Sequence, residues 1–232
     1  MKLGIICALD AEAENIVKAV TDRSDETAGT LTFTTGKIGE NEIVLSICGM
    51  GKVCAAMCAQ TMIIKYSPDI ILNTGIAGGL TSELGVGDFA VSTALVQHDI
   101  DLYDLDKTPL GYHPSLHIVE FPADILTVDR VEKIFSSLGV KVKRGVIASG
   151  DQFISKTEMK EKLAREFGAI ACEMEGGAVA QVCYMNKVPF AVIRSISDGA
   201  DESSLSDYYT FKMFAAAKSS ELVIKFLEEM TK

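Results

Sequence analysis

The sequence lacks the paired ligands that metal centres and disulfide frameworks require. None of its six cysteines belongs to a C-x-x-C pair, and none of its three histidines lies near a cysteine in the sequence. The cysteines fall in or beside apolar runs, where a thiol behaves as a small hydrophobic side chain. The pattern argues against a zinc site or a set of disulfides, so we expect no metal, and it favours a reducing, cytoplasmic environment.

Long apolar runs and an excess of positive charge are also missing. No stretch reaches the ~18 uninterrupted apolar residues of a membrane-spanning helix. The apolar start of the chain is cut short by Asp10, Glu12 and Glu14, so it predicts a first buried strand rather than a signal peptide. The net charge of −10 argues against binding to nucleic acid phosphates or to an anionic membrane. We therefore expect neither of these as a partner.

The phosphate-binding fingerprints of nucleotide cofactors are absent. The segment from Gly75 to Gly79 does not match G-x-G-x-x-G, and Gly49-Met50-Gly51-Lys52 lacks the P-loop spacing. No nucleotide cofactor is therefore expected. Glycines at 75–79 still allow backbone N–H groups to approach a sugar or a base.

What the sequence does contain is a regular alternation of strand-like apolar runs and helical patterns. Its 232 residues, 48% of them hydrophobic, are enough for one domain with a sizeable core. We expect buried strands at 3–7, 70–72, 88–91, 94–97, 142–148, 170–172 and 188–193, and a hairpin formed by 31–35 and 42–47. Helices are expected at 10–20, 53–66, 124–138, 176–185 and 206–230, and a further helix is expected to start at the capping box Ser155-x-x-Glu158. This order predicts an α/β fold, a three-layer α/β/α arrangement with a mostly parallel, mixed central sheet, in a single domain over residues 1–232.

Polar side chains and glycines follow several of these predicted strands. They lie in the segments 8–12, 73–79, 149–154, 173–175 and 194–201. Because the carboxyl ends of parallel strands meet at one edge of a sheet, we expect most of these segments to lie together there. The long stretch 99–123 has no clear period, which is typical of a functional loop or an interface element.

Each candidate residue also has a simpler structural interpretation. Glu12 lies in the first turn of its predicted helix, where unpaired N–H groups favour an ionised carboxylate. Such a carboxylate could deprotonate water, but Glu is also common in first turns for the same electrostatic reason. Glu175 could accept hydrogen bonds from sugar hydroxyls or belong to an ordinary helix start. Phe153 could stack on a planar base or belong to the core. Asp198, before Gly199, could serve as an acid or only form a turn.

Five motifs occurring in one order make the functional interpretation more specific. They are Gly4-Ile-Ile-x-Ala-x-x-x-Glu12, Asn73-Thr-Gly-x-Ala-Gly-Gly79, Ser149-Gly-Asp-x-Phe-Ile154, Glu173-Met-Glu175 and Arg194-x-Ile-Ser-Asp198. With them the chain closely resembles the bacterial 5′-methylthioadenosine/S-adenosylhomocysteine nucleosidases of the purine nucleoside phosphorylase fold family. The resemblance extends from Lys2 to the last predicted helix.

The resemblance implies hydrolysis of the N-glycosidic bond of 5′-methylthioadenosine and S-adenosylhomocysteine, and also of 5′-deoxyadenosine, without a cofactor. It places this reaction in methionine salvage and the recycling of S-adenosylmethionine by-products. It implies that Asp198 protonates N7 of adenine, Glu12 activates the attacking water and Glu175 binds the ribose hydroxyls. It further implies contacts to the base and sugar from Gly78, Phe153, Ile154, Met174, Ser197 and Ala200, support of the carboxylates by Arg194, and a 5′-alkylthio pocket of Leu9, Met50, Ile76 and Tyr208. A homodimer is implied too, in which a loop at 99–112 reaches into the partner's pocket.

The chain departs from the family pattern at the far end of this pocket. The family commonly has Ser in place of Ile76 and Met in place of Leu9, and often Phe in place of Tyr208, so the preference for the 5′ substituent stays open. The order among 5′-methylthioadenosine, S-adenosylhomocysteine, 5′-deoxyadenosine and deoxyfutalosine-type nucleosides stays open with it.

Three other functions compete with hydrolysis. A phosphorylase of the same fold must bind a phosphate dianion, usually with Arg and Ser, but the matching strand end offers Asn73 and Ile76, and the first loop is acidic. A non-enzymatic nucleoside sensor would have no need of the three carboxylates together. A dinucleotide-dependent oxidoreductase lacks its fingerprint.

Overall fold

The computed structural model describes residues 1–199 and 204–230. The strands are β1 (Lys2–Cys7), β2 (Thr21–Ala28), β3 (Leu31–Ile38), β4 (Asn41–Ile47), β5 (Ile70–Gly79), β6 (Phe89–Gln97), β7 (Phe121–Pro122), β8 (Val142–Ser149), β9 (Ala169–Glu173) and β10 (Phe190–Asp198). The helices are α1 (Asp10–Ala19), α2 (Lys52–Tyr66), α3 (Tyr103–Asp106), α4 (Ile125–Ser137), α5 (Thr157–Phe167), α6 (Gly176–Asn186) and α7 (Ser204–Glu229).

All of these strands belong to one mixed sheet, part of which closes on itself. The strand order is β10-β6-β8-β9-β5-β1-β4-β3-β2, with β7 beside β6. Strand β5 also pairs in parallel with β10, so that β5, β10, β6, β8 and β9 form a closed ring. Strands β4, β1, β5 and β10 run parallel to one another, which brings their carboxyl ends to the same edge.

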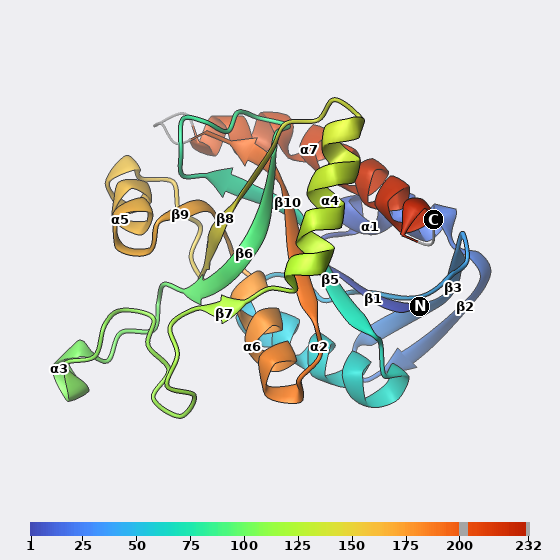
Figure 1. Cartoon of the computed structure of the whole chain (residues 1–232), viewed down its shortest axis with the longest axis horizontal. Helices are drawn as coiled ribbons and strands as arrows, with labels where there is room; N and C mark the ends of the chain where they lie inside the picture. Colours follow the sequence, from blue (N-terminus) through green and yellow to red (C-terminus); the bar gives the residue numbers. More distant parts are fainter. Residues whose placement is uncertain (200–203, 231–232) are drawn as a thin grey trace.

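Helices cover both faces of this sheet, which gives the expected layers (Figure 1). On one face, α1, α4 and α7 pack against β1, β5 and β10, and the buried apolar residues of α4 are spaced three to four apart, as helix periodicity requires. On the other face lie α2 and α6, whose small Ala and Cys side chains allow close packing. The α/β fold with a mixed sheet is therefore confirmed. Among the described residues, no helix has both the length and the apolarity needed to cross a membrane.

The two strands that matter most for function are longer than the sequence indicates. Residues 73–79 and 194–198 were expected as loops because they are rich in glycine and polar side chains, yet they continue β5 and β10. The two segments pair with each other, with Arg194 opposite Gly75 and Asp198 opposite Gly78. Their polar side chains are buried instead of facing water. Asp198 is consequently the last residue of a strand rather than part of a turn.

Two further differences concern β2, at the edge of the sheet, and β6, within the closed ring. The exposed, charged segment Thr21–Ala28 forms β2, which pairs with β3 through its backbone and lacks the apolar alternation that marks a strand. The expected strands at 88–91 and 94–97 are one strand, β6, with a break in register between Ser92 and Ala94.

Candidate active site

A cavity of about 430 Å³ lies at the carboxyl ends of β1, β5, β9 and β10. A small annex of about 30 Å³ continues it beneath Phe153, with Ile154 in its wall. Of the residues predicted for the site, the cavity is lined by Leu9, Glu12, Met50, Ile76, Gly78, Phe153, Met174, Glu175, Ser197, Asp198 and Tyr208. Arg194 does not line it but lies behind its carboxylates, and Ala200 falls outside the described residues.

Glu12 is held at the start of α1 by backbone groups of the β1–α1 connection and of β5. One of its carboxylate oxygens accepts hydrogen bonds from the N–H groups of Ala8 and Leu9, each at 2.9 Å, and the other accepts from Ile76 N–H at 3.0 Å. The side chain is only 2% exposed. Burial raises the pKa of Glu12, while Arg194 and the three N–H donors oppose that rise. The carboxylate is thus fixed in position and poised to accept a proton.

Arg194 is the buried cation that organises the carboxylates. It is fully buried on β10, and its Nη2 donates to Asn73 Oδ1 at 2.6 Å and to Glu173 Oε2. The same nitrogen lies 3.5 Å from Glu175 Oε2. Glu173 also accepts hydrogen bonds from Ser149 and from the N–H group of Gly176 at the start of α6. A buried carboxylate needs such partners, so Glu173 holds the site together.

Glu175 faces the cavity with most of its hydrogen-bonding capacity unused by this network. Its Oε1 accepts from Gly51 N–H at 2.9 Å, and its Oε2 makes only the longer contact to Arg194. Gly51 has a φ of 92°, a conformation that favours glycine and that presents its N–H to the carboxylate. Burial raises the pKa of Glu175 to about 7, with Arg194 opposing and Glu173 adding to the rise.

Asp198, the last residue of β10, lines the same cavity and is 1% exposed. Ser197 Oγ donates to its Oδ1 at 2.8 Å, and Lys160 Nζ lies 3.2 Å from its Oδ2. Gly78 leaves room for this carboxyl, because a Cβ at that position would lie 3.0 Å from Oδ2. Burial raises the pKa of Asp198, while Ser197 and Lys160 lower it. A carboxyl in this environment retains its proton to higher pH than an exposed one.

Apolar and aromatic side chains form the remaining wall. The rings of Phe153 and Tyr208 meet edge to face at 5.1 Å between centroids. Leu9, Met50 and Ile76 line the same cavity. Among the described lining residues none is Lys, Arg or His, so every formal charge in the wall is negative. The cavity therefore suits a neutral ligand with a planar part, a polar part and an apolar end.

Several residues of this site were not predicted from the sequence. Lys160 is the most informative, because it shares the buried face of α5 with Leu163 and a lysine on an apolar helix face is a readable signal. Glu173 stood in a recognised motif but was given no role, and Tyr209, which also lines the cavity, follows a predicted residue directly. The holding contacts of Ala8 and Gly51 come from backbone N–H groups, which no side-chain pattern reveals.

Comparison with known proteins gives consistent matches over the whole length. Residues 2–230 match the phosphorylase superfamily. A 5′-methylthioadenosine/S-adenosylhomocysteine nucleosidase of Shewanella loihica is 36% identical over 235 residues, covering 99% of this chain and 100% of that protein. A mutant of the Helicobacter pylori nucleosidase, solved with 5′-methylthioadenosine in its active site, has a TM-score of 0.94 at 35% identity, covering 99% of both chains. A futalosine hydrolase of the same organism has a TM-score of 0.94 at 34% identity, covering 99% of this chain and 98% of its own.

Proposed function

This chain belongs to the phosphorylase superfamily, and within it to the 5′-methylthioadenosine/S-adenosylhomocysteine nucleosidases. From that premise we propose how its residues hydrolyse the N-glycosidic bond of 5′-methylthioadenosine and S-adenosylhomocysteine. The products are adenine and the 5-thio-substituted ribose. The observation that carries the proposal is one cavity whose wall combines Glu12, Glu175 and Asp198 with an apolar end. The three carboxyl groups supply the acid, the base and the sugar contact that such a reaction requires.

Asp198 is the proposed general acid. Adenine is a poor leaving group as an anion, so a proton must reach its N7 as the bond to the sugar breaks. Burial raises the pKa of Asp198, which favours the protonated carboxyl that a general acid needs. Ser197 holds the carboxyl from one side, and the Phe153 ring nearby can stack on the base.

Glu12 is the proposed general base. A carboxylate offers about four acceptor positions, and the backbone of Ala8, Leu9 and Ile76 occupies three of them. The remaining position is available to a water molecule, whose proton Glu12 takes as the water attacks the anomeric carbon.

Glu175 is the proposed sugar-binding residue. Its Oε1 accepts a single backbone hydrogen bond, and its Oε2 is only loosely paired with Arg194, so both oxygens can accept from ribose hydroxyls. As the bond to adenine breaks, the sugar becomes cation-like, and the nearby carboxylates stabilise its developing charge.

Water fits this site as the nucleophile better than phosphate does. A phosphorylase holds its phosphate dianion with cationic and hydroxyl side chains. Here the described wall contains four carboxylates, and the buried Arg194 already serves Asn73, Glu173 and Glu175. A dianion would meet repulsion without a free cation, whereas a neutral water molecule would not.

Product analysis tests this proposal. We expect purified protein to release adenine from 5′-methylthioadenosine in phosphate-free buffer, with free 5-methylthioribose as the second product. Added phosphate should leave both the rate and the products unchanged. An absolute phosphate requirement, with a sugar 1-phosphate as product, would refute hydrolysis. Parallel assays with S-adenosylhomocysteine, 5′-deoxyadenosine and a deoxyfutalosine-type nucleoside would rank the substrates.

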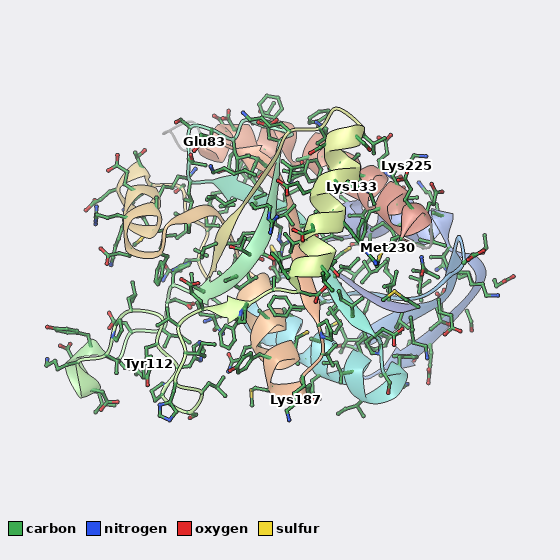
Figure 2. All side chains as sticks on the ribbon, in the orientation of Figure 1. Glu83, Tyr112, Lys133, Lys187, Lys225 and Met230 are labelled. Carbon is green, nitrogen blue, oxygen red and sulfur yellow. The ribbon has the colours of Figure 1, made fainter. Side chains whose placement is uncertain are left out.

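The proposal includes a homodimer in the cytoplasm, with a role in methionine salvage. The segment around α3 projects away from the sheet, and Tyr112 lies within this projection (Figures 1 and 2). Beside it, α2 and α6 expose large apolar side chains, namely Val53, Met57, Ile64, Tyr184 and Met185. Such a face favours burial against a second copy, into whose pocket the 99–112 loop would reach. The Ile64 side chain is 71% exposed in a single chain. In sedimentation experiments we expect the wild type to be dimeric and the Ile64→Glu variant to be monomeric.

A further inference from the structure

A buried lysine lies beside the proposed acid and is not explained by its function so far. Lys160 is on α5, on the face that packs against the sheet with Leu163, and its side chain is 1% exposed. Lysine is almost never fully buried without a partner, because removing an ammonium group from water is costly. The next lysine of this helix, Lys162, is exposed, as is usual for a surface helix. The position of Lys160 therefore calls for an account in terms of its contacts.

Those contacts join the ammonium group to the last residues of β10. Lys160 Nζ lies 3.2 Å from Asp198 Oδ2 and donates to the Gly199 carbonyl oxygen. With Ser197 on Oδ1, both carboxyl oxygens of Asp198 are held. Lys160 lines neither the cavity nor its annex, so any effect it has on the substrate must pass through Asp198.

We propose that Lys160 is a positioning residue for the reaction: its ammonium group fixes the Asp198 carboxyl at the strand end and stabilises the carboxylate that remains once the proton has moved to the leaving base. In that step the Asp198 O–H bond breaks and an N–H bond forms on adenine. The electron pair of the glycosidic bond stays with adenine. The negative charge left on Asp198 is then paired with Lys160. The inference rests on the proposed function, because it requires Asp198 to be the acid.

The groups around Asp198 show why this cation is useful. Burial and the charge of Asp207 on α7 raise the pKa of Asp198, and Ser197 and Lys160 lower it. The other titratable neighbours are Cys172 on β9, whose thiol pKa is raised to about 12 chiefly by burial, and Tyr208 on α7, whose pKa burial also raises. Lys160 is thus the cation that opposes burial at this carboxyl. An acid works best when its pKa lies near the working pH, so unopposed burial would leave Asp198 protonated but a poorer donor.

The pH dependence of turnover distinguishes this role from a merely structural one. We expect Lys160→Met to shift the alkaline limb of kcat/KM upward by about one pH unit, since the charge that lowers the pKa of Asp198 is gone. On the plateau, kcat should fall roughly 3- to 30-fold with little change in KM, a smaller loss than removal of the acid itself causes. Lys160→Arg, which keeps the charge, should restore the wild-type limb. Lys162→Met, on the exposed face, should match the wild type throughout.

A double variant shows whether Lys160 acts through Asp198. If it does, adding Lys160→Met to Asp198→Asn should cause no further loss of kcat. An equal fold-loss in both backgrounds, or an unmoved alkaline limb in Lys160→Met, would overturn the inference. If Lys160→Met fails to fold, the same pH profile and double-variant comparison can be made with Lys160→Gln, which also removes the charge. Wild-type turnover in Asp198→Asn would instead refute the proposed function itself.

Discussion

Replacing Gly75 with alanine tests whether the position of Glu12 depends on a gap in strand β5. Gly75 pairs with Arg194 in the sheet, and its backbone has no unusual conformation. A Cβ built there would lie 2.3 Å from Glu12 Oε1 and 2.5 Å from Arg194 Nη1. Non-bonded atoms do not approach so closely, so both side chains must move by about 1 Å to restore ordinary contact. The methyl group therefore displaces the proposed base and the cation behind it.

The expected loss is larger in activity than in stability. A misplacement of about 1 Å can cost 10²-fold in rate, so we expect kcat for 5′-methylthioadenosine to fall about 10²-fold. Overpacking a buried site costs about 1–3 kcal/mol, a decrease in melting temperature of roughly 2–12 °C for a chain of this size. Gly79→Ala is the matched control on the same strand, because its Cβ would meet its nearest atoms at 3.4 Å or more. Normal turnover in Gly75→Ala, or an equal loss in Gly79→Ala, would refute this reasoning.

Two further predictions concern the carboxylates themselves. Glu12→Gln and Asp198→Asn should each lower kcat by about 10²-fold or more. The control Glu14→Gln, on the exposed side of α1, should leave kcat unchanged. Normal steady-state turnover in Glu12→Gln or Asp198→Asn would remove that residue from its role. Burial raises the pKa of Glu175 to about 7, against about 4.3 in an unfolded chain. Between these pH values the folded state holds a proton on Glu175 that the unfolded state lacks. The contribution of this proton to the stability of the fold is therefore complete below pH ~4 and is lost as the pH rises through 7. Glu175→Gln should therefore melt above the wild type at pH 8 but not at pH 4, and a difference that does not change with pH would contradict the assigned pKa.

Much of the fold was predictable because its buried elements have simple patterns. The apolar runs of β1 and β8 and the three-to-four spacing in α4 each have one plausible solution. The layered arrangement follows from their alternation. Strand β2 was not predictable, because its side chains are exposed on both faces and lack the apolar alternation that marks a strand.

The site was predictable to the extent that its residues stand in motifs. Glu12, Glu175 and Asp198 come from distant parts of the chain, and only the order of their motifs indicated that they meet. The Asn73–Gly79 segment was misassigned as a loop because a strand with glycines and polar residues is unusual outside a buried site. Lys160 belongs to no motif, and its role depends on a contact across 38 positions of sequence, which no local pattern specifies.

The charges of the site explain why protons, water and a cation-like sugar belong together here. Four carboxylates, Glu12, Glu173, Glu175 and Asp198, line the cavity, and two buried cations, Arg194 and Lys160, lie behind them. If all were ionised, the site would carry two uncompensated negative charges, which burial makes costly. Proton uptake relieves that cost, in agreement with the raised pKa values of Glu175 and Asp198. In the proposed reaction, the positive charge that develops on the sugar compensates the cavity as Asp198 gives up its proton, and Lys160 compensates the carboxylate that is left. On this proposal the charge distribution is more favourable in the transition state than in the resting site.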